Sequence, residues 1–301
     1  MDAEDIDDRD HYWKGLTSKC LIKSSTHPLE YAKLLIQIGH EPIPPMLCKP
    51  LIGQPCLVLP NIFSYTKYIY EVDGFKGMYA GLAPKLVGVF VEHSSSWFMT
   101  NYVKFEKKDT LDPEDSDLKG WEKCLLNTTK ELVCSTTSVL LSYPFRLITI
   151  RMMAQFVGFE HRYTGIFSSF AIIYREEGIT GFYSGLWPSL MYTLSYVIIS
   201  NVAKHAITRY LFNPSTVSLT IADFASSYCA NFVAYPFNVV SSCIAINNCG
   251  LAAGMPPEMP VFGNWVECMK YLYGIDQLGR GASYFYRRHV TPARSKLIKL
   301  N

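Results

Sequence analysis

Charged side chains are scarce in this sequence of 301 residues. Asp, Glu, Lys and Arg make up 18% of it, whereas soluble domains usually contain roughly a quarter. Hydrophobic residues account for 49%, yet no segment is a clean apolar run of about 20 residues, the length that spans a bilayer. This combination predicts a membrane protein with a polar interior. A large soluble α-helical protein is the alternative, but it would show longer charged faces.

The sequence also lacks the motifs of common enzymes and metal sites. It has no GxxxxGK loop, no HExxH and no glycine-rich turn after a strand, and its seven histidines are dispersed. The nine cysteines are odd in number and have no CxxC spacing, which favours reduced thiols over a disulfide framework or zinc site. No basic run with interleaved aromatics marks a nucleic-acid surface. We therefore expect no catalysis, no cofactor, no metal and no nucleic-acid partner.

A targeting signal is missing from the start of the chain as well. Residues 1–12 are expected to form an acidic tail, because the first ten residues contain six acids and one arginine. Transit peptides are rich in arginine and poor in acids, and secretory signals have an apolar core. Any targeting information is therefore expected to be internal.

Five apolar segments are long enough to cross a bilayer, although each contains polar residues. They cover residues 13–38, 82–103, 125–157, 186–211 and 217–246. A charge at the bilayer centre costs about 2.5–3.5 kcal/mol on insertion scales, so the polar residues should face a protein interior or water. The charged stretch 104–123 is predicted to be a loop and the clearest boundary in the chain. Proline-rich stretches at 42–55 and 254–260 are predicted to be connectors.

Three of these segments belong to an internal repeat. Each carries a proline after an aromatic or polar residue, namely Pro28 in "THPLEYAK", Pro144 in "SYPFRLIT" and Pro236 in "AYPFNVVS". A second element follows the first two, "GMYAGLAPKL" with Gly81 and Pro84 and "GFYSGLWPSL" with Gly185 and Pro188, and a degraded copy lies at 274–292. The repeat predicts three units, 13–103, 124–211 and a truncated, degenerate 212–301.

This pattern resembles the mitochondrial carrier family, whose repeats carry P-x-[DE]-x-x-[KR] and then [DE]-G-x-x-x-[FY]-x-G-L-x-P. The stretches "LLIQIGHEPIPP", "YREEGITGFYSGL" and "INNCGLAAGMPP" are similar to its mitochondrial carrier homologue subgroup. The resemblance implies an all-α membrane protein with a threefold pseudo-repeat. Each repeat would contain a kinked helix, a short interfacial helix and a return helix.

The sequence departs from a working transporter in two respects. Only the first repeat keeps the acid and base of the motif, Glu30 and Lys33, while the second has Arg146 at the acid position and the third has Asn238 there. The gate pattern of the even-numbered helices is also not clean, so we expect no alternating access. Only nine residues follow Pro292, too few for a sixth spanning helix. We therefore expect a carrier-like bundle that lacks this helix and opens sideways to lipid.

The resemblance implies an insertase function in the mitochondrial outer membrane. Members of the subgroup are described as inserting α-helical proteins there, especially tail-anchored ones, so such proteins and membrane lipids are the expected partners. The polar residues expected to line the groove are Lys33, Glu131, Arg146, Arg151, Thr193, Asn201, Asp223, Asn231 and Asn247. Each of these could instead make a structural hydrogen bond between helices.

Other functions stay open at this point. The subgroup is also associated with recruiting a pro-apoptotic regulator, for which the 104–123 stretch would be the receptor surface. Lipid scrambling through the same groove is a further alternative, whereas the broken gate motifs disfavour solute transport. Whether segment 13–38 spans the membrane, and which way the termini face, does not follow from the residues.

Overall fold

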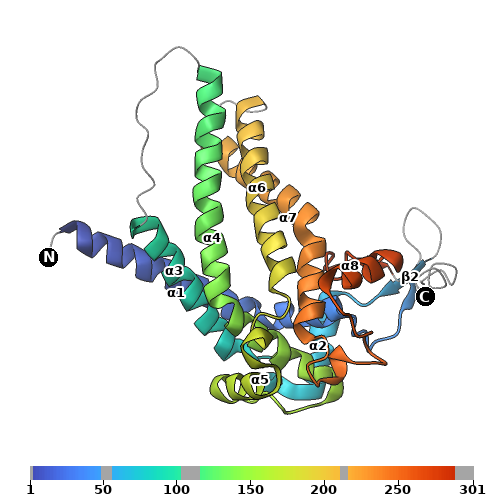
Figure 1. Cartoon of the computed structure of the whole chain (residues 1–301). Coiled ribbons are helices and arrows are strands. Elements are labelled where there is room, and N and C mark those ends of the chain that lie inside the picture. The colour runs from blue at the N-terminus through green and yellow to red at the C-terminus, as the bar shows by residue number, and fades with distance from the viewer. Residues whose placement is uncertain (1–2, 49–55, 103–115, 211–215, 289–301) are drawn as a thin grey trace.

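The computed structural model describes residues 3–48, 56–102, 116–210 and 216–288, and these are mainly helical (Figure 1). Five helices are long: α1 (Ala3–Ile38), α3 (Leu82–Tyr102), α4 (Ser116–Ala154), α6 (Leu186–Tyr210) and α7 (Thr216–Ile246). Three are short: α2 (Ile62–Gly77), α5 (Ile166–Gly181) and α8 (Trp265–Gly274). Two 3₁₀ turns, η1 (Gln155–Gly158) and η2 (Ala252–Gly254), follow α4 and α7. Each of the five predicted segments contributes one long helix, so the prediction of an α-helical architecture is confirmed.

The glycines and prolines of the second repeat element act through the backbone. Gly81 and Gly185 have φ values of +77° and +80°, in the left-handed region that favours glycine. Each directly precedes a return helix, α3 or α6. Pro84 and Pro188 lie in the first turn of those helices, where a missing N–H removes no intrahelical bond. The motif therefore marks a chain reversal from a short helix into a long one.

Only two of the described helical stretches are long and apolar enough to cross a bilayer by length and composition. They are Gly120–Gly158 and Thr220–Ile246. The helices α1, α3 and α6 do not meet the same criterion. Composition alone therefore supports two of the five predicted spans.

The predicted acidic tail (1–12) and the predicted charged loop (104–123) are both partly helical. The helix α1 begins at Ala3, so the predicted acidic tail over 1–12 is helical from Ala3 onward. Residues 116–123 form the first two turns of α4, which corrects the loop boundary, while 103–115 lie outside the described residues. Acidic side chains near a helix N-terminus interact favourably with its dipole, so these segments can be helical without an apolar stripe.

A small sheet also departs from the all-α prediction. The stretch 42–55, predicted as a connector, contains β1 (Met46–Cys48), which pairs antiparallel with β2 (Cys56–Leu59). The strand β2 pairs in turn with β3 (Arg287–Arg288), so the strand order is β1-β2-β3. Strands this short have no hydrophobic periodicity that a sequence could show. The sheet ties the first repeat to the last described part of the third.

The long helices form a bundle that is closed at one end. The helices α4, α6 and α7 run alongside one another, with α1 and α3 beside them and α2 and α5 at the lower end in Figure 1. The tightest pairing is between α6 and α7. One face of α7 is built from small buried residues at four-residue spacing, Ala222, Ser226, Ala230 and Ala234, which permit close helix approach. The apolar core gathers where α1, α4 and α7 end, which we call the closed end.

The helices α1 and α7 contact each other at the closed end. Gln37 near the end of α1 donates to the Tyr235 hydroxyl of α7 at 3.1 Å and accepts from Ser242 at 3.1 Å. Toward their N-terminal ends the two helices diverge (Figure 1). After α8 the described chain contains turns and β3 but no further helix. Residues 289–301 lie outside the described residues, so the absence of a sixth helix stays a prediction.

Candidate functional site

A polar pocket of about 490 Å³ lies at the closed end, between α1, α3, α4 and α7. Its charged lining residues are Lys23, Glu30, Lys33, Lys85, Glu92 and Arg146. Four cations thus face two carboxylates. The pocket is an electropositive chamber beside the contact between α1 and α7.

Glu30 and Lys33, the intact motif pair of the first repeat, have different partners. Glu30 forms ion pairs with Lys85 of α3 at 2.8 Å and Lys23 of α1 at 3.5 Å, all within the first repeat. Lys33 reaches the third repeat instead. Its Nζ donates to the Tyr284 hydroxyl at 3.3 Å and lies 5.2 Å from the ring centre of Tyr235. A cation over an aromatic face therefore replaces an ion pair between these repeats.

Arg146 joins the second and third repeats. Its guanidinium donates to the Ser189 hydroxyl of α6 at 2.7 Å and to the side-chain oxygen of Asn238 in α7 at 2.9 Å. Arg146 and Asn238 occupy the acid positions of their two repeats. Among the described lining residues, no ion pair crosses from one repeat to another. Across repeats, the pocket lining is thus held by neutral acceptors and ring contacts, without the charge pairs that a carrier gate exchanges.

Polar pairs continue from the pocket toward the opposite end of the bundle. Three hydrogen bonds or ion pairs link α4, α6 and α7: Tyr192–Asn231 at 3.2 Å, Asn201–Glu131 at 2.6 Å and Lys204–Asp223 at 2.5 Å. Glu131 precedes the lining residue Ser142 by 11 positions, close to three helical turns, so both lie on one face of α4. We call these pairs together with the pocket the polar path.

Most predicted groove residues are placed on or beside this path. Lys33 and Arg146 line the pocket, while Glu131, Asn201, Asp223 and Asn231 belong to the pairs above it. Thr193 is half-buried and donates to the Ser189 carbonyl of its own helix at 3.1 Å.

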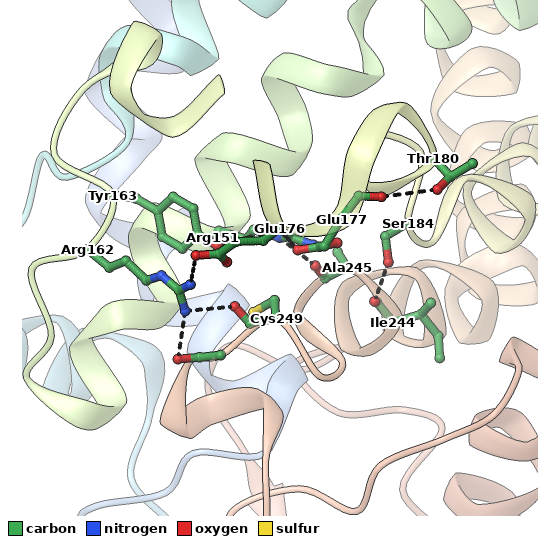
Figure 2. Close-up of polar contacts among 11 residues, drawn as sticks. Arg151, Arg162, Tyr163, Glu176, Glu177, Thr180, Ser184, Ile244, Ala245 and Cys249 are labelled. Carbon is green, nitrogen blue, oxygen red and sulfur yellow. Dashed lines mark hydrogen bonds and ion pairs between the residues drawn. The ribbon is translucent and has the colours of Figure 1, made fainter. Parts of the chain in front are cut away.

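Arg151 does not line the groove, and the prediction for it is wrong. Its side chain is fully buried and forms a bidentate ion pair with Glu177 of α5 (Figure 2). The distance from Arg151 Nη2 to Glu177 Oε2 is 2.8 Å. Its Nε also donates to the Ala245 carbonyl at 3.1 Å. Arg151 follows Arg146 by five positions, which places it about 140° around the helix and away from the pocket.

Asn247 is also structural, and its prediction is likewise wrong. It lies just beyond α7, donates to the Phe262 carbonyl at 2.8 Å and accepts from the Phe262 N–H at 3.0 Å. Nearby, Arg162 pairs with Glu176 and donates to the Cys249 carbonyl at 3.2 Å (Figure 2). The hydrogen bond with Glu176 raises the pKa of Arg162, so it stays charged. The hydrogen bond from Arg162 to Cys249 links the second repeat to the third.

The most informative residue missed by sequence reasoning is Lys85. It follows Pro84 as Ser189 follows Pro188, so both occupy the same slot of the repeat. In the structure each of them contacts the acid-position residue of its own repeat, Glu30 or Arg146. Aligning the second repeat element with the first would have predicted both contacts.

A family model described as Mitochondrial carrier protein matches more than half of the chain, over residues 10–108 and 130–215. The chain belongs to the mitochondrial carrier family. The family assignment made from the proline and glycine motifs is therefore confirmed, and the protein is a carrier-family membrane protein with a carrier-like helical fold.

Several relatives match over most of this carrier-family chain. It is 34% identical to Mitochondrial carrier homolog 1 of Mus musculus, over 89% of this chain and 74% of that protein. It is 33% identical to Mitochondrial carrier homolog 2 of Homo sapiens, over 87% of this chain and 89% of that protein. Solute carrier family 25 member 16 of Homo sapiens is more distant, at 24% identity over 91% of this chain and 81% of that protein.

Proposed function

We propose that this protein is an insertase for α-helical membrane proteins, notably tail-anchored ones, and that it crosses the mitochondrial outer membrane several times. The observation that carries the proposal is the polar path, which begins at the pocket between α1, α3, α4 and α7. The names of its mitochondrial carrier homolog relatives support a mitochondrial membrane, and the similarity to that subgroup supports the insertase role.

The physical task of an insertase is to move a polar flank across hydrocarbon. The apolar helix of a client partitions into the bilayer favourably, but each charge on its flank costs about 2.5–3.5 kcal/mol at the centre. A membrane-exposed row of hydrogen-bonding groups lowers this cost, because the flank exchanges water for protein partners and need not be fully desolvated. This process needs no nucleotide and no moving gate.

The contacts at the closed end favour this function over solute transport. A carrier alternates by breaking and reforming bonds between its repeats, and those bonds must be matched in two states. Here Glu30 is bound within its own repeat, and Arg146 is held by Ser189 and Asn238. Neither arrangement supplies a reversible charge pair between repeats. A static, laterally open polar path fits these contacts better.

A depletion experiment tests the proposal. Mitochondria lacking the protein should insert less tail-anchored client, and the wild-type chain should restore insertion. A variant with Glu131, Asn201 and Asn231 all replaced by Leu should fail to do so, with a rate at least about tenfold lower for a barrier rise of about 1.4 kcal/mol.

The matched control replaces exposed polar residues outside the polar path. Thr100 and Thr129 bond only to carbonyls of their own helices, so Thr100→Leu with Thr129→Leu should leave insertion unchanged. If the triple Leu variant is correctly folded and inserts like wild type, the insertase proposal is wrong.

Lipid scrambling is a second candidate, favoured by the excess of cations in the pocket. Four basic side chains in a chamber of about 490 Å³ suit the phosphate of a lipid headgroup. Liposomes with a labelled phospholipid would detect this activity as loss of inner-leaflet protection. The receptor role for pro-apoptotic regulators also stays a proposal, since most of the stretch assigned to it lies outside the described residues.

A further inference from the structure

One face of α7 carries a seam that runs the length of the helix. Its residues recur at steps of three or four positions: Ile221, Phe224, Tyr228, Phe232, Tyr235, Val239, Ser242 and Ile246. A mean step near 3.5 residues is the period by which one helix packs along another. The seam is therefore patterned for a partner helix over its whole length.

Only half of this seam has a partner in the structure. The half near the closed end is buried, and its Tyr235 and Ser242 are hydrogen-bonded to Gln37 of α1. In the other half Phe224, Tyr228 and Phe232 are each 74% exposed. The helix α1, which contacts the buried half, diverges from α7 toward their N-terminal ends (Figure 1). The bare half thus continues an established helix–helix interface.

The bare half also borders the polar path. Phe224 precedes Asn231 by seven positions, and Asn231 precedes the pocket residue Asn238 by seven, so all three share one face of α7. Lipid chains covering this face would place hydrocarbon against Asn231 and the Lys204–Asp223 pair. A client helix with an apolar body and a polar flank matches both the exposed half of the seam and the polar path.

We propose that Phe224, Tyr228 and Phe232 are the docking face for the transmembrane helix of an insertion client. This inference rests on the proposed insertase function and names where the client's apolar part binds. From Ile221 to Phe232 the face is about 17 Å long, roughly half of the hydrocarbon core. A contact of that length holds the client helix in register with the polar path. The remainder of the client helix stays in contact with lipid, so the client can dissociate into the bilayer.

Site-specific photo-cross-linking tests the docking face. A photoreactive phenylalanine analogue is placed at Tyr228, or at Val233 as a matched control on the same helix. Val233 is also exposed but lies about 140° around the helix from Tyr228. The full chain is reconstituted in phosphatidylcholine liposomes and supplied with a tail-anchored client. We expect client adducts at Tyr228 in several-fold higher yield than at Val233.

Other outcomes of the cross-linking would overturn the inference. Equal yields at the two positions, or no client adduct at Tyr228, would show that the seam does not select a helix. Adducts with lipid alone would assign the face to the bilayer. Adducts between two copies of this chain would assign it to self-association.

A second variant separates this inference from the insertase proposal. Phe224, Tyr228 and Phe232 are all replaced by Ala, and folding is checked by gel filtration and thermal unfolding. Insertion should fall several-fold. If this variant inserts normally while the triple Leu variant of the polar path fails, the docking face is wrong and the insertase stands. If neither variant changes insertion, the insertase proposal itself falls.

Discussion

Replacing Glu177 by Leu is expected to lower the free energy of unfolding by about 3–5 kcal/mol. The Arg151 side chain is 0% exposed, and Glu177 supplies both oxygens that face its terminal nitrogens. Removing Glu177 leaves a buried guanidinium whose charge is not compensated, because the Ala245 carbonyl and the Tyr163 hydroxyl are neutral acceptors. Thermal or denaturant unfolding of the purified protein in detergent measures the loss.

Two further variants make this test specific. The pair Lys67–Glu71 is exposed on α2, so Glu71→Leu should cost less than about 1 kcal/mol. Replacing both Arg151 and Glu177 by Leu should recover much of the lost stability, since no charge is then left buried. Equal losses for Glu177→Leu and Glu71→Leu would contradict the assignment of Arg151 as a buried structural cation.

Replacing Gly185 by Ala is expected to destabilise the protein by about 2–5 kcal/mol. The left-handed conformation costs an L-residue about 1–2 kcal/mol, and overpacking adds about 1–3 kcal/mol. A Cβ at Gly185 would lie 2.8 Å from the Ser241 carbonyl oxygen and 2.9 Å from the Tyr143 hydroxyl. The first is backbone and cannot swing aside, so α6 would have to move away from α7.

The control for this variant is Gly279→Ala. A Cβ at Gly279 meets no atom within 4 Å, and its φ is not in the left-handed region, so its stability should stay within about 0.5 kcal/mol of wild type. Unfolding of the two variants side by side separates the effect of the site from that of the substitution. A neutral Gly185→Ala would show that the turn before α6 does not require glycine.

Much of the candidate site follows from the repeat. Pro28, Pro144 and Pro236 each lie inside a long helix, and the motif position two residues later places Arg146 at the pocket and Asn238 opposite it. The charge of Arg151 and its apolar surroundings favour groove lining, but this prediction is wrong because the side chain is buried against Glu177. The five-residue spacing between Arg146 and Arg151 places Arg151 about 140° around the helix from Arg146, on the side away from the pocket. The sequence spacing alone gives this angle.

The sequence by itself determined the family and the five long helices, and it marked Gly81 and Gly185 as positions of the repeat. These features depend on local properties, namely apolar segments of sufficient length and glycines at fixed positions of the repeat. Only the tertiary structure decided which partner each polar residue takes. Glu30 pairs with Lys85 within its repeat and Lys33 reaches Tyr284 across repeats, because those distances depend on how α1, α3 and α7 are rotated and spaced. The small sheet and the half-covered seam of α7 arise in the same way, from contacts between segments far apart in the chain.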